Sequence, residues 1–276
     1  MTAGQGKGGG RAGGRLVRRH TVWTRLTHWL WAVSLFFLML SGLQVFNAHP
    51  VLHVGEESGF AYDNAVLAIG ATGEGAAARG FIRILGAEFD TTGFLGVQQG
   101  TVQAIPAALT IPSYRSLAAG RVVHFFFAWL LLAVLALWLV AAAATGHLRD
   151  LVPTRADLRA LPRDIADHAR LRLRHGRGYG ALQKLAYAGV LFVLLPLMIL
   201  TGLTMSPWFN AWFPWTLDLF GGRQTARTLH FAVMLLLAGF FAVHMLMVLL
   251  AGPVNELRSI LTGWYRIDPD QEGGAG

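Results

Sequence analysis

The sequence predicts an all-α integral membrane protein, an up-and-down bundle of four helices. Of its 276 residues, 54% are hydrophobic and only 14% are charged, which does not suit a water-soluble globule of this length. Four stretches lack Asp, Glu, Lys and Arg, and each is long enough to cross a hydrocarbon core of about 30 Å as a helix. These predicted spans are residues 26–46, 122–145, 185–205 and 228–251.

The segments between the spans predict the topology. Residues 1–20 are Gly-rich and basic and predict a disordered leader; residues 21–266 are the expected helical domain, and 267–276 a flexible tail. Four spans put both termini on one side, and 17 of the 23 lysines and arginines lie in residues 1–25, 146–184 and 252–276. The positive-inside rule therefore predicts cytoplasmic termini in a bacterial inner membrane. Orientation also explains the net charge of +8 without nucleic-acid binding.

The two large loops differ in character. The long loop (47–121) is expected on the outer side, facing a partner. Its uncharged part, 94–111, is long enough for a fifth span, but its glutamines and Pro106 favour a surface-lying or re-entrant segment. The basic loop (146–184) contains an amphipathic, Arg-rich stretch, 155–174, that would either lie on anionic lipid headgroups or form a solvated helix.

Histidines distinguish the spans. Ionisable side chains at membrane depth are costly and face the bundle interior, where they bind a cofactor, relay protons or pair with polar groups. Four of the ten histidines fall within the spans: His28, His124, His230 and His244. The other six are expected to be solvated or interfacial: His20, His49, His53, His147, His168 and His175. The third span carries no histidine, and Pro196 is expected to kink it.

The four intramembrane histidines can form two pairs. His230 and His244 are 14 residues apart on one span, which brings them within about 40° of the same face and about 21 Å apart along the axis. By depth, His230 can meet His124 near the outer surface, and His244 can meet His28 near the cytoplasm. Two such pairs suit two haems stacked across the bilayer as an electron wire.

Other residues extend this hypothesis. An arginine lies three residues before three of the candidate ligands and could hold haem propionates or simply snorkel. These are Arg25, Arg121 and Arg227. The chain contains no cysteine, which excludes covalent haem attachment and thiolate iron–sulfur ligation.

Five motifs resemble the bacterial di-haem cytochrome b subunits, the cytochrome b561 bacterial/hydrogenase group that includes formate dehydrogenase gamma and thiosulfate-reductase types. The motifs are TRLTHW at 24–29, GRVVHFFFAW at 120–129, GHLRDL at 146–151, QKLAY at 183–187 with LTG at 200–202, and LHF with HM within 229–245. Together they cover all four spans, roughly residues 20–265. The long loop departs from the formate dehydrogenase pattern.

The resemblance implies two b haems, with ligands at the four histidines already chosen. It also implies quinone chemistry near the cytoplasmic haem, with Gln183 and Lys184 as candidates or as interfacial anchors. The expected partner is a periplasmic redox protein or a molybdenum-cofactor enzyme, with this chain as its quinone-reacting subunit. The alternatives are a proton or ion transporter with a histidine relay, a stand-alone quinone-linked cytochrome, and a cofactor-free membrane anchor. The transporter is disfavoured because the spans contain no Asp or Glu.

Overall fold

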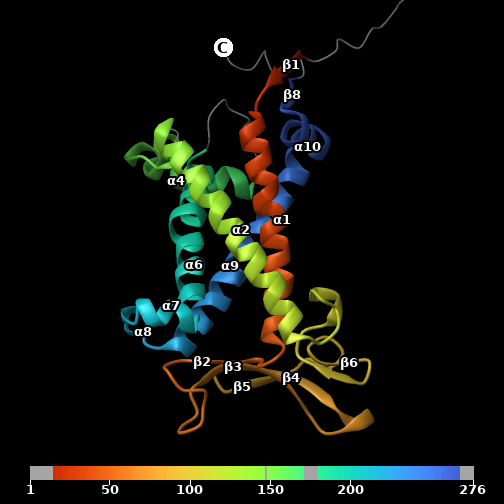
Figure 1. Ribbon diagram of the computed structural model, residues 1–276. Helices are drawn as coiled ribbons and strands as arrows, with labels where there is room; N and C mark the ends of the chain where they lie inside the picture. Colours follow the sequence, from red (N-terminus) through yellow and green to blue (C-terminus); the bar gives the residue numbers. More distant parts are fainter. Residues whose placement is uncertain (1–14, 147, 171–179, 268–276) are drawn as a thin grey trace, which may run out of the picture. The chain divides into compact units, whose positions relative to one another are not determined.

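The computed structural model describes residues 15–146, 148–170 and 180–267. Within them, four helical stretches are long and apolar enough to cross a membrane (Figure 1). They are Val22–Phe46 (α1), Leu117–Ala144 (α2), Ala181–Thr204 (α5, η3 and α6 in succession) and Arg223–Ala251 (α9). The four predicted spans are therefore present as helices.

Each helical stretch begins four or five residues before the predicted span. The extra residues include Arg25, Arg121, Lys184 and Arg227, which a charge-free criterion leaves out. Long basic side chains are tolerated in the end turns of such helices because their charged heads extend toward water. The charge-free stretches consequently underestimate the helices at their N-terminal ends.

The third span is not a regular α-helix. It consists of α5 (Ala181–Gly189), a π-helical turn η3 (Val190–Leu194) and α6 (Leu195–Thr204). Pro196 is the second residue after the π turn. Because proline has no N–H to donate to the carbonyl four residues earlier, the regular hydrogen-bond ladder cannot continue through this position, and the wider turn accommodates the break.

The prediction of an all-α protein is wrong for the long loop. Four strands form an antiparallel sheet in the order β2 (Val51–His53), β3 (Ala65–Thr72), β4 (Arg79–Ile84), β5 (Ala87–Asp90). The hairpin β6 (Gly96–Gln98) and β7 (Thr101–Gln103) and two short 3₁₀ turns, η1 (Gly75–Ala77) and η2 (Ala107–Leu109), accompany it. The 94–111 segment thus forms a hairpin and a turn, so the fifth-span alternative is wrong as well.

The sheet is attached to the end of α1. Phe46, at the end of that helix, shares a buried core with Leu52, Ile69 and Ile105. Beside this core the Asn47 side chain pairs with the backbone of Ile105, accepting from its N–H at 2.7 Å and donating to its carbonyl at 3.2 Å. The loop is therefore fixed to the helices by both apolar and polar contacts.

The chain divides into two compact units. The larger is Leu30–Ala242, and within it Figure 1 shows the helices running side by side. Phe37 of α1 stacks on Phe127 of α2 with ring centroids 4.3 Å apart, and Phe46 of α1 meets Phe231 of α9 at 4.7 Å. The shorter helices of this unit are α3 (Leu148–Leu151), α4 (Arg155–Ala169), α7 (Pro207–Trp212) and α8 (Trp215–Phe220).

The smaller unit comprises the described parts of Met1–Trp29 and Val243–Gly276. It contains the start of α1, the end of α9, α10 (Pro253–Thr262) and a two-stranded antiparallel sheet of β1 (Arg15–Arg18) and β8 (Trp264–Ile267). The Arg19 guanidinium pairs with Glu256 at 3.2 Å, so side chains also join the two chain ends. Most of the predicted leader and nearly all of the tail, residues 1–14 and 268–276, lie outside the described residues.

Candidate cofactor site

His124 of α2 and His230 of α9 lie next to each other within the larger unit. Their ring centroids are 6.4 Å apart, and the ring planes are inclined by 63°. Two metal–imidazole bonds of about 2 Å each, together with the two ring radii, place such centroids about 6 Å apart. The separation therefore fits one metal ion held between the two rings.

A buried serine orients the ring of His124. The Ser41 hydroxyl donates to the carbonyl of Phe37 at 2.6 Å and lies 3.1 Å from His124 Nδ1. Because the single hydroxyl proton is already used within α1, the oxygen accepts from Nδ1–H. This contact fixes the tautomer and leaves the lone pair of Nε2 available to a metal.

A buried threonine repeats this arrangement at His230. Thr201 of α6 donates to the carbonyl of Leu197 at 2.7 Å, and its hydroxyl oxygen lies 3.0 Å from His230 Nδ1. Ser41 and Thr201 are both 0% exposed. The two rings are thus held by the same hydrogen-bond pattern from two helices that carry neither of these histidines.

A glycine follows each hydroxyl residue and allows the imidazole to approach. A Cβ added at Gly42 would lie 3.3 Å from His124 Cε1, and one added at Gly202 would lie 3.2 Å from His230 Cε1. We call each hydroxyl–glycine dipeptide, Ser41-Gly42 and Thr201-Gly202, a histidine cradle. Neither Ser41 nor Thr201 is recognisable in the sequence as a partner of a histidine; the visible signal is that each precedes a glycine within a span.

His28 of α1 and His244 of α9 both belong to the smaller unit. They are close enough for a direct electrostatic interaction. Nδ1 of His28 is buried and has no hydrogen-bond partner in the described part of the chain. Nδ1 of His28 therefore lacks the kind of contact that Nδ1 of His124 and Nδ1 of His230 each make with a hydroxyl.

The three arginines expected near haem propionates all contact the protein. Arg25 donates to the carbonyl of Thr262 at 3.1 Å, and the Arg121 guanidinium lies 5.5 Å from the ring centre of Phe125. Arg227 donates to the carbonyls of His49 and, at 2.9 Å, Val51. Arg227 thus also ties the long loop to α9, one turn before His230. The propionate role of all three stays a prediction.

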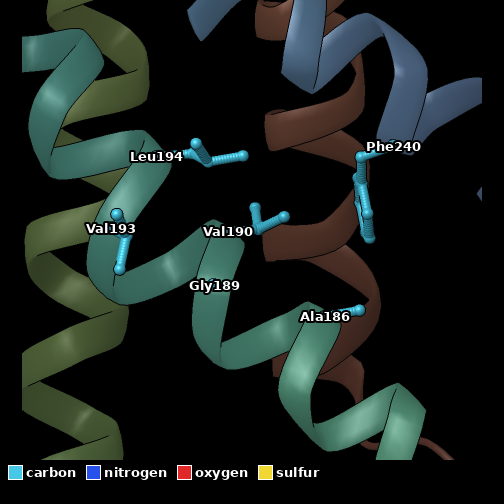
Figure 2. A pocket seen from close by; sticks show the side chains of 6 residues that line it. All are labelled: Ala186, Gly189, Val190, Val193, Leu194 and Phe240. Atoms are coloured by element: carbon cyan, nitrogen blue, oxygen red, sulfur yellow. The ribbon is translucent and has the colours of Figure 1, made fainter.

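The two quinone candidates also have protein partners. Gln183 donates to the Tyr187 hydroxyl at 2.8 Å, and the Lys184 ammonium lies 3.1 Å from the Asp157 carboxylate. Further along the third span, an apolar groove of about 380 Å³ lies between this span and Phe240 of α9. Figure 2 shows the side chains that line it. Neither Gln183 nor Lys184 lines this groove.

His53 is only 5% exposed, so of the two roles expected for it, solvated or interfacial, the solvated role is wrong. Its ring stacks on that of His49 with centroids 5.6 Å apart. Burial and the neighbouring Arg227 guanidinium hold the pKa of both histidines below the ordinary value, so both rings are neutral at pH 7. The folded loop places this pair beside α9, an arrangement that their sequence positions did not indicate.

Four apolar membrane-spanning helices, three of which carry paired histidines, define a class of protein, the membrane cytochromes b. In the described residues no cluster of three or more His, Asp or Glu side chains could hold a metal ion, but a haem iron needs only two axial histidines. The His124–His230 separation and the fixed Nδ1 atoms fit such a group.

The chain belongs to the prokaryotic cytochrome b561 family, whose sequence model matches residues 19–263. It is therefore a cytochrome b561-type membrane cytochrome, from a family that binds b-type haem. It is also 27% identical over 234 residues to a protein of Azospira oryzae named putative protein-methionine-sulfoxide reductase subunit YedZ1. That match covers 84% of this chain and 90% of the relative.

Proposed function

We propose that this protein is a di-haem cytochrome b subunit that transfers electrons between the quinone pool and a redox partner at the outer face of the bacterial inner membrane. His124 and His230 are the ligands of one haem, and His28 and His244 are the ligands of the other. The observation that carries this proposal is the His124–His230 pair, with ring centroids 6.4 Å apart and both Nδ1 atoms engaged by hydroxyls.

The chain's own residues prepare the His124–His230 position for a large planar group. The histidine cradles hold both rings in one tautomer, and both hydroxyls are fully buried, so water cannot compete for Nδ1. A haem with two axial histidines supplies one-electron transfer without an open coordination position. The residues therefore only have to bind, orient and exclude water.

The protein exchanges electrons with a quinone and with a second oxidoreductase. Gln183 and Lys184 remain the quinone candidates, supported by their place in the first turn of the third span. The partner is a periplasmic redox protein or a molybdenum-cofactor oxidoreductase. The relative's name describes a subunit of a reductase, which supports a partner enzyme rather than a stand-alone cytochrome. The folded sheet of the long loop supplies a surface for that partner.

The decisive experiment counts haem in the purified chain and in four single variants. We expect two non-covalent b haems per chain by pyridine haemochrome assay. His124→Ala and His230→Ala should each lose one haem, and the spectrum of the remaining haem should be the same in both variants. His28→Ala and His244→Ala should lose the other haem. Midpoint potentials from a redox titration identify which haem remains in each variant.

His20→Ala serves as the control, because His20 lies outside the spans yet in the same unit as His28. It should retain both haems. A folded but haem-free wild-type protein contradicts the proposal. Full haem content in His230→Ala contradicts the ligand assignment and leaves the family assignment intact.

A further inference from the structure

The helix α4 (Arg155–Ala169) turns two of its carboxylates toward the third span. Asp157 pairs with the Lys184 ammonium at 3.1 Å, and Asp164 accepts from the backbone N–H of Leu182 at 2.8 Å. Residues seven apart lie on one face of a helix, so these contacts fix which side of α4 packs against α5. The acidic face of the helix is therefore used inside the protein.

Other faces of α4 carry exposed arginines and exposed apolar side chains. Arg155, Arg159 and Arg163 follow one another at intervals of four residues, and all three are exposed. None of them forms an ion pair within the described residues. Leu158 is 52% exposed and Ile165 is 48% exposed. At about 100° per residue these two form a stripe beside the first arginines of the row.

The contacts of α4 place it beside the N-terminal end of the third span. Both of its partners, Leu182 and Lys184, lie in the first turn of the stretch Ala181–Thr204, which is long and apolar enough to cross a membrane. Figure 1 shows α4 at this end of the third span. A helix with an apolar stripe beside a row of basic residues at this depth has the character of an interfacial helix.

We propose that the exposed side of α4 binds the headgroups of anionic phospholipids. Arg155, Arg159 and Arg163 supply the charge complementarity, and Leu158 and Ile165 enter the boundary of the acyl chains. The exposed apolar stripe favours a lipid over an acidic soluble protein. Acyl chains of a lipid cover the apolar side chains, whereas a partner bound by charge alone leaves them in water. Asp167, one turn after Arg163, reduces the charge at the far end, so Arg155 and Arg159 carry most of the effect.

The test uses native mass spectrometry of the full chain released from detergent containing equal amounts of phosphatidylglycerol and phosphatidylcholine. We expect the wild-type chain to retain phosphatidylglycerol preferentially. One basic residue near an anionic surface changes association by about fivefold. The double variant Arg155→Gln with Arg159→Gln should therefore reduce the ratio of bound phosphatidylglycerol to bound phosphatidylcholine at least about threefold. Leu158→Gln with Ile165→Gln should also reduce the total bound lipid.

The matched control is Arg79→Gln with Arg115→Gln, which removes the same charge from two exposed arginines of the long loop. This control should keep the wild-type lipid ratio, and all variants should keep the wild-type visible spectrum. An equal loss of phosphatidylglycerol in both double variants overturns the proposal, because it indicates a net-charge effect. Absence of any preference in the wild type also overturns it and favours an acidic protein as the occupant.

Discussion

Ser41 and Thr201 make the same pair of hydrogen bonds from two different helices. Each hydroxyl donates to a carbonyl of its own helix and accepts from an imidazole of another helix. Ferric iron draws electron density from its ligands and strengthens an Nδ1–H hydrogen bond, so an accepting oxygen favours the oxidised haem. The histidine cradles are therefore expected to lower the potential of the haem they support.

The potential of one haem should respond to these hydroxyls. A neutral hydrogen bond worth about 1 kcal/mol corresponds to about 40 mV for a one-electron couple. We expect Ser41→Ala and Thr201→Val each to raise one midpoint potential by up to about 40 mV, measured by optical redox titration. The other midpoint potential should not change. Thr201→Ser keeps the hydroxyl and should therefore keep both wild-type midpoint potentials. Unchanged midpoints in both variants would show that the hydroxyls do not act on a haem ligand.

The glycine of a cradle should tolerate no bulky side chain. A Cβ at Gly202 would already lie 3.2 Å from His230 Cε1, so Gly202→Val must displace the imidazole. We expect this variant to purify with one haem fewer than the wild type. Gly189→Val is the matched control on the same span, because a Cβ there meets no protein atom within 4 Å. Equal haem content in both variants would contradict this role.

At the scale of elements, Asp157 joins α4 to α5. Its carboxylate accepts from the backbone N–H and the hydroxyl of Thr154, and it pairs with Lys184. These contacts lower the pKa of Asp157 from 3.8 to about 2. Since the folded state favours the ionised form, this stabilisation is fully present above pH 4 and is lost as the pH falls toward 2.

Asp157→Asn should therefore destabilise the protein in a pH-dependent way. We expect a lower Tm than wild type at pH 7, with the difference shrinking between pH 4 and pH 2. The measurement is thermal unfolding followed by visible absorbance at each pH. Asp218→Asn controls for a lost carboxylate elsewhere. A difference in Tm that stays constant down to pH 2 would contradict the assigned contacts.

At the scale of the whole molecule, the orientation in the membrane can be tested directly, because the chain contains no native cysteine. Single cysteines at Glu74, in the long loop, and at Arg155, in the basic loop, are both exposed. The positive-inside rule predicts that a membrane-impermeant maleimide labels Glu74→Cys from the periplasmic side. Arg155→Cys should react only after permeabilisation. The reverse pattern would invert the proposed topology and place the sheet in the cytoplasm.

The sequence by itself determined the features that depend on neighbouring residues. Charge-free stretches defined four helices, and their positions within those stretches selected His28, His124, His230 and His244 as candidate ligands. The motifs identified the family that the comparison with its sequence model then confirmed. These properties are local, because hydropathy and helical periodicity depend only on about 25 consecutive residues.

Only the tertiary structure decided which groups meet. The sheet of the long loop, the contacts of Arg227 and the burial of His53 all require segments distant in sequence. Ser41 and His124 are 83 residues apart, and Thr201 and His230 are 29 residues apart. A buried imidazole takes whichever acceptor the packing brings to it, so its tautomer is fixed by a neighbouring helix and not by its own sequence. The four histidines were thus visible in the chain, whereas the cradles that orient two of them arise from folding.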